Sequence, residues 1–160
     1  MFMKTPNPLL CIFTTLLWIS SCSDQPRQDP ILQSELKTHF SLISDGNTGS
    51  ARVRLRQFMD ANGESPQALF LMGLSYHHEK QYALAVQWFD RAAAPENAHN
   101  AYPPTWHFLA WSHFYIGNTV ASRDAFLHYL VMDPDEGDSL FGLGLLAMED
   151  GELEMSTLPR

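Results

Sequence analysis

Histidine and cysteine are the residues of this chain whose types could support chemistry, and there are seven histidines and two cysteines. His77 and His78 are consecutive, so on a helix their side chains point about 100° apart and cannot share one metal ion. His107 and His113 are six positions apart, whereas ligands on one helix face stand three or four apart. Neither an HExxH sequence nor a glycine-rich phosphate loop occurs. The sequence therefore predicts no metal, no cofactor and no catalytic residue.

Cys22 is distinguished by the residues that precede it. Lys4 gives a positively charged start, and residues 9–18 are almost continuously apolar. This stretch has the length of the hydrophobic region of a secretory signal, about 7–15 residues, and is shorter than the roughly 20 residues that span a bilayer. Ile19, Ser20 and Ser21 then lead to Cys22 at the position where a signal peptide would be cut.

This arrangement resembles the lipobox of bacterial lipoproteins, in which an aliphatic residue and two small residues precede a cysteine. The resemblance implies a signal peptide over residues 1–21, a diacylglycerol thioether on Cys22 and acylation of the new amino group. Several acyl chains, such as palmitate, hold a protein on a membrane almost permanently. Residues 22–30 would be a flexible tether. Ser23 after the cysteine favours an outer-membrane location facing the periplasm. An ordinary cleaved signal with a coincidental cysteine is the alternative.

The charge distribution restricts the class of partner. The net charge is −8, and no Lys or Arg occurs from position 124 through position 159. An acidic surface of this kind repels phosphate backbones, so nucleic-acid binding is not expected. The acidic residues either keep the chain soluble or face a basic partner. Cys11 lies in the predicted signal, so the mature chain would have no free thiol.

Apolar residues recur with helical spacing in units of nearly constant length. One apolar stripe consists of Leu69, Met72, Gly73 and Tyr76. After a polar turn, a second stripe consists of Tyr82, Ala85, Phe89 and Ala92. The first stripe returns 37 positions later at Trp106, Leu109 and Ala110, and 34 positions after that at Leu140, Leu143 and Gly144. A glycine inside a helix costs about 1 kcal/mol relative to alanine, so Gly73 indicates a close helix–helix approach.

These units resemble tetratricopeptide repeats, which are 34-residue helical hairpins. Residues 66–99 and 103–136 match the repeat pattern, residues 137–153 match its first helix only, and residues 32–65 match weakly. The resemblance implies an all-α solenoid of about 3 to 3.5 repeats over residues 31–160.

We expect about seven helices, ending near Glu149, with turns at 45–48, 78–81 and 116–119. Gly151 occupies the turn position of Gly117. The helix that should cover Leu140, Leu143, Leu146 and Ala147 is therefore expected to be short or absent. This uncapped end predicts self-association or docking of a partner.

In tetratricopeptide arrays the first helices of successive hairpins line a groove that takes peptides. Residues offset from the packing stripe toward that groove are predicted to bind the partner, and they are Phe70, His77, His107, Trp111, Phe114, Tyr115, Phe141 and Met148. Rows of mostly aromatic side chains suit apolar or proline-bearing segments. The histidines beside them predict an affinity that changes between about pH 6 and pH 7.

The sequence thus favours a non-enzymatic, lipid-anchored scaffold of the bacterial envelope that binds proteins or peptides. Lipoproteins of similar architecture serve in the assembly of pili, outer-membrane complexes and cell-wall complexes. A small periplasmic metal protein or hydrolase that uses the histidines is the alternative.

Overall fold

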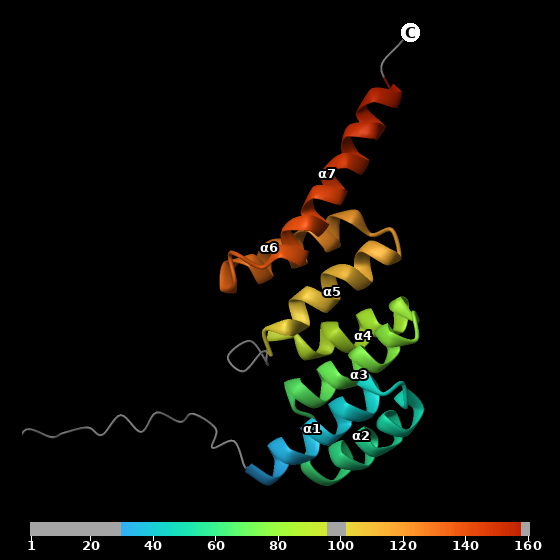
Figure 1. Cartoon of the computed structure of the whole chain (residues 1–160), viewed down its shortest axis with the longest axis vertical. Coiled ribbons are helices and arrows are strands. Elements are labelled where there is room, and N and C mark those ends of the chain that lie inside the picture. The colour runs from blue at the N-terminus through green and yellow to red at the C-terminus, as the bar shows by residue number, and fades with distance from the viewer. Residues whose placement is uncertain (1–29, 96–101, 158–160) are drawn as a thin grey trace, which may run out of the picture.

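The computed structural model describes residues 30–95 and 102–157, and these residues form helices without any strand. The seven helices are α1 (Pro30–Ser44), α2 (Thr48–Asn62), α3 (Pro66–His78), α4 (Tyr82–Ala92), α5 (Pro104–Tyr115), α6 (Thr119–Met132) and α7 (Gly137–Thr157). They are stacked in chain order, with α1 and α2 at one end and α7 at the other (Figure 1). The predicted all-α solenoid is confirmed.

The helix ends follow from capping and turn residues. Ser65 accepts a hydrogen bond from the Ala68 amide at the start of α3, and Pro66 occupies the first turn of that helix. Gly46 and Gly117 adopt φ values of 79° and 76° in the turns after α1 and α5. The predicted turns at 45–48, 78–81 and 116–119 are confirmed.

Glycine allows the closest helix contact, as the sequence predicts. A Cβ atom at Gly73 would lie 2.5 Å from Cε1 of Phe89, so the Phe89 ring occupies the space that a side chain on α3 would need. In the next hairpin Ala110 takes the place of Gly73, and Ser122 of α6 donates a hydrogen bond to its carbonyl oxygen over 2.9 Å. Phe89 and Phe126 are both fully buried.

α3, α5 and α7 each bury one side chain at an equivalent position of the repeat. Ser75, Ser112 and Leu146 lie at equivalent positions of α3, α5 and α7, and all three are fully buried. On α7 the close approach is made by Gly142, where a Cβ would lie 2.4 Å from Cζ of Phe126. This face of α7 is therefore covered by α6.

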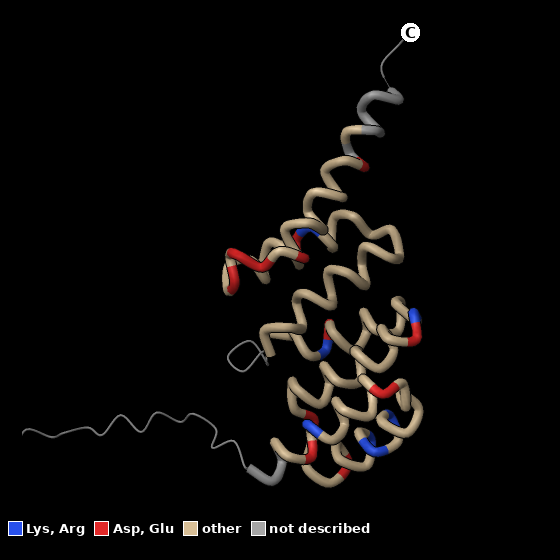
Figure 2. Tube along the Cα trace, viewed as in Figure 1, with Lys and Arg blue, Asp and Glu red and all other residues tan. Residues whose placement is uncertain are grey.

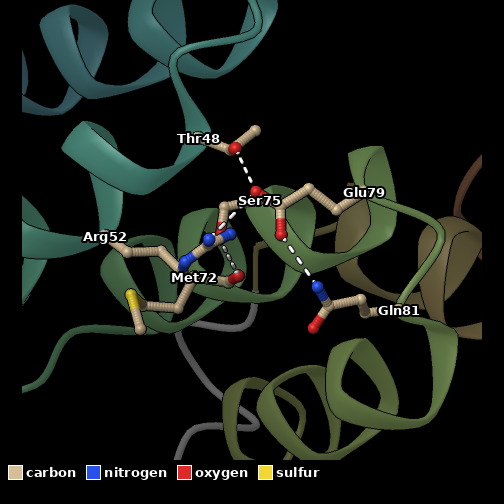
Figure 3. Close-up of polar contacts among 6 residues, drawn as sticks. All are labelled: Thr48, Arg52, Met72, Ser75, Glu79 and Gln81. Carbon is tan, nitrogen blue, oxygen red and sulfur yellow. Dashed lines mark hydrogen bonds and ion pairs between the residues drawn. The ribbon is translucent and has the colours of Figure 1, made fainter.

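A polar cluster joins α2 to the end of α3 (Figure 3). Glu79 accepts hydrogen bonds from Thr48 and from Arg52, the latter over 2.9 Å, and Gln81 donates to its other oxygen over 3.0 Å. The Arg52 guanidinium also lies 4.7 Å from the centre of the Tyr76 ring. The hydrogen bonds from Arg52 and Thr48 lower the pKa of Glu79. The cluster fixes the first hairpin against the second.

The C-terminal end differs from its prediction in two respects. First, α7 continues through Gly151 to Thr157, so no turn occurs there. No atom lies within 4 Å of the place that a Cβ on Gly151 would take, and an isolated glycine is tolerated in a helix. Second, Leu146 is fully buried because it faces the preceding hairpin, whereas Leu140 is half exposed. The expectation that Leu146 is uncovered was wrong.

The predicted signal peptide, Cys22 and most of the tether lie outside the described residues. Among the helices of residues 30–95 and 102–157, none has the length and apolar character needed to cross a membrane.

Candidate partner-binding groove

The first helices of the first two hairpins enclose a cavity of about 250 Å³. Its lining comes from α1, from α3 and from the residues just before α5, and it consists of Gln33, Leu36, Lys37, Phe40, Gln67, Phe70, Leu71 and Tyr102. The lining is mostly apolar, with polar side chains from both helices among it. A cavity of this kind fits an apolar side chain presented on a peptide backbone.

Aromatic contacts hold the wall of this cavity in place. Phe70 is buried, and its ring centre lies 4.9 Å from that of Tyr102 and 5.7 Å from that of Phe108. Phe40 and Tyr102 are partly exposed and so remain available to a ligand. Gln33, Gln67 and Lys37 supply amide and ammonium groups that can bind backbone carbonyls or a carboxylate. The predicted residue Phe70 thus lines the cavity.

A second aromatic cluster lies farther along α5. The Tyr115 ring stacks on Tyr82 at 4.4 Å and on Trp111 at 5.9 Å between ring centres. Trp111 also packs edge-on against Phe114 and against the buried Phe126. The structure therefore brings Trp111, Phe114 and Tyr115 together, as one group separate from the cavity lining. Of the three, Tyr115 is the most exposed.

His77 belongs to the contact between two hairpins. Its Nδ1 lies 2.9 Å from Oγ of Ser112, and Ser112 donates its only hydroxyl proton to the carbonyl oxygen of Phe108. His77 must therefore donate from Nδ1, which fixes the tautomer. Burial lowers the pKa of His77 to about 4, so the ring is neutral at pH 6–7. The expectation of a charge change near pH 6–7 was wrong for this histidine.

His107 joins α5 to the start of α7. Its Nδ1 lies 3.0 Å from Oγ of Ser139 and 3.5 Å from Oε2 of Glu136. Glu136 also accepts hydrogen bonds from the amides of Asp138 and Ser139 at the start of α7. Burial acts to raise the pKa of Glu136, but the hydrogen bonds from Ser139 and Asp138 outweigh it and the pKa is lowered. The position of His107 suits a contact between hairpins.

Residues 41–100 match the family model described as Tetratricopeptide repeat. The matched segment runs from the end of α1 to just beyond α4, and so contains the Gly73–Phe89 contact. Residues 41–100 of this chain therefore consist of tetratricopeptide repeats. No curated protein matches it.

The last two predicted residues of the repeat groove lie on α7. Phe141 and Met148 are both exposed, and neither lines the cavity. Of the eight predicted residues, one lines the cavity, three form the α5 cluster, two histidines lie between hairpins and two residues lie on α7. Phe108 lies between Phe70, His77 and His107, with its ring centre 5.2–5.7 Å from each of theirs. The role of the eight residues in binding stays a prediction.

Seven residues that line the cavity were not predicted, namely Gln33, Leu36, Lys37, Phe40, Gln67, Leu71 and Tyr102. The signal for Leu36 was present, because subtracting 34 from Phe70 gives position 36. The weak match of residues 32–65 concealed it. Tyr102 precedes α5 and lies outside any helical stripe, so periodicity could not find it.

The described part of this repeat protein offers no group for metal chemistry. Within residues 30–95 and 102–157, no cluster of three or more His, Cys, Asp or Glu side chains could hold a metal ion. Repeats of this family serve as protein-interaction scaffolds, and that is the general function the match supports.

Proposed function

We propose that this tetratricopeptide-repeat protein is a non-enzymatic, lipid-anchored scaffold of the bacterial cell envelope. It binds a protein partner and contributes to the assembly of a pilus, an outer-membrane complex or a cell-wall complex. The observation that supports a binding function is the cavity between α1 and α3. Its lining is mostly apolar with a few polar side chains, as in surfaces that bind peptides.

The ligand is an extended or helical peptide that inserts one apolar side chain. Phe40 and Tyr102 contact that side chain from opposite elements, and Phe70 forms the wall behind it. Gln33 and Gln67 lie at equivalent positions of α1 and α3, 34 residues apart, and hold the peptide backbone. This arrangement needs no catalytic group.

The lipid anchor on Cys22 would hold the cavity between α1 and α3 near the membrane. The first residue of α1, Pro30, stands eight positions after Cys22, and a chain of that length spans at most about 30 Å. The repeat domain therefore stays close to the membrane surface. A partner held in the groove would be kept there too.

The test compares partner capture by the wild type and by Tyr102→Ala. Removing an aromatic contact residue from a binding surface typically costs about 2 kcal/mol or more, so capture should fall roughly thirtyfold. Val53→Ala is the matched control, because Val53 is exposed on α2 and does not line the cavity. Circular dichroism checks that all three proteins are folded. Equal affinity of the wild type and Tyr102→Ala would contradict the groove assignment.

A further inference from the structure

The last helix exposes an apolar face that its counterpart α5 keeps covered. On α7 the exposed side chains of this face are Leu140, Phe141, Gly144, Ala147 and Met148. With 100° between successive residues they form one continuous arc along the helix. The residues 34 positions earlier on α5 are Trp106, His107, Ala110, His113 and Phe114, and all of them are buried or half-buried. The face on α5 is covered by α6, whereas no described helix covers it on α7.

The open face of α7 has space for a side chain beside Gly144. Gly144 lies 71 positions after Gly73, at the equivalent place of the repeat. Beside Gly73 the space is filled by the ring of Phe89 from the second helix of the hairpin. Beside Gly144 no atom of the described residues lies within 4 Å of the position a Cβ would take. By comparison with Gly73, the space beside Gly144 suits an aromatic ring from a packed helix.

A second apolar stripe lies on α6. Val120, Leu127 and Val131 of α6 are exposed, and Val131 is 83% exposed. α6 is the helix on which α7 packs. The stripe therefore belongs to the same end of the stack as the open face of α7.

The surroundings of the open face are acidic. Exposed carboxylates lie at Asp124 on α6, at Asp133 and Asp135 in the connection, and at Asp138 and Glu149 on α7. The acidic residues gather visibly at the α6–α7 connection (Figure 2). No Lys or Arg occurs from position 124 through position 159. A second copy docked through the same face would bring carboxylates against carboxylates, whereas a basic helix would be attracted.

We propose that the open face of α7 and the exposed apolar stripe of α6 bind an amphipathic helix of a partner protein. The partner helix places an aromatic side chain beside Gly144 and surrounds its apolar stripe with lysine or arginine. It takes the place that α4 takes on α3. This surface is separate from the cavity between α1 and α3, so it is a second binding site of the scaffold.

The experiment uses two synthetic peptides, each roughly 18 residues long so that an isolated helix is feasible. They share a stripe of leucine, alanine and one phenylalanine, and carry either lysine or glutamate at the other positions. The full chain should bind the lysine peptide at least tenfold more tightly than the glutamate peptide at low salt. Gly144→Leu should weaken that binding at least tenfold. Gly49→Leu is the matched control, because a Cβ at Gly49 also meets nothing within 4 Å.

Other occupants give different results. Equal binding of the two peptides, or unchanged binding to Gly144→Leu, would overturn the proposal. A wild-type chain that sediments as a dimer, and as a monomer after Gly144→Leu, would assign the face to a second copy. Flotation of the Cys22→Ala chain with phosphatidylcholine vesicles, if Gly144→Leu abolishes it, would assign the face to a lipid surface. Tyr102→Ala should bind the lysine peptide like the wild type, so failure here is distinguishable from failure of the groove.

Discussion

Three helical glycines of this chain differ in what surrounds them. A Cβ would meet Phe89 at Gly73 and Phe126 at Gly142, but it would meet nothing at Gly144. We expect Gly73→Ala and Gly142→Ala to lower the free energy of unfolding by about 1–3 kcal/mol, because each overpacks a buried ring. Gly144→Ala should instead raise it by up to about 1 kcal/mol through helix propensity. Urea unfolding of the three variants measures these changes, and equal destabilisation of all three would contradict the packing described.

The pH dependence of stability should report on His77. Its pKa is about 4 in the folded chain, below the ordinary value of 6.5, because of burial first and of neighbouring His78 and His107 second. Above pH 6.5 neither state binds a proton here, but between pH 6.5 and pH 4 the unfolded chain does. Stability should therefore be full above pH 6.5 and fall as the pH decreases toward 4.

The variant His77→Gln isolates this contribution. Unfolding free energies at pH 7.5 and pH 5 should differ less in His77→Gln than in the wild type. His39 and His113, whose pKa values burial also lowers, remain in both proteins and so cancel in the comparison. An identical loss in the two proteins would show that the folded state protonates His77 readily.

At the scale of the helices, α7 has support on one side only. Leu146 is fully buried against the preceding hairpin, whereas Leu140 is half exposed. Leu146→Ala should cost about 2–4 kcal/mol and release α7 from α6, while Leu140→Ala should cost well under 1 kcal/mol. Amide hydrogen exchange checks this, since protection in α7 should fall in Leu146→Ala before it falls in α3. Uniform loss of protection over all helices would show that α7 does not detach by itself.

The helices and turns were predictable because their signals are local. The stripe of Leu69, Gly73 and Tyr76 repeats at nearly constant spacing, and Gly117 sits at a turn where a positive φ is needed. The end of α7 was not predictable in this way. Gly151 occupies a turn position of the repeat, but an isolated glycine is tolerated within a helix and α7 continues through it.

The groove was predictable only in part, because offset from a stripe does not decide burial. Phe70 faces the groove side as predicted but is buried by Tyr102 and Phe108. Trp111 packs on Phe126, so Trp111→Ala would disturb the core as well as any binding surface. Tyr102 is a better test residue because it is partly exposed, lies outside the helices and lines the cavity. Its contact with Phe70 crosses from a connection to α3, which no periodic pattern encodes.

For the whole molecule, the proposed anchor makes a direct prediction. Cys22→Ala removes the sulfur atom to which the diacylglycerol would attach. The protein should then move from the membrane fraction to the soluble periplasmic fraction, because no described helix is able to span a bilayer. Cell fractionation followed by immunoblotting measures this, with Cys11→Ala as the matched control. If the Cys22→Ala protein stays with the membrane, the anchor lies elsewhere.

The stacking of hairpins in chain order has a consequence for how the chain folds. Helices that are consecutive in the sequence, such as α3 with α4 and α5 with α6, make the most extensive contacts with each other. Contacts of short sequence separation require only short loops to close, and chains built from them fold quickly. Folding can therefore start at any hairpin and spread to its neighbours. The first hairpins can reach their native arrangement before the last residues of the chain have emerged.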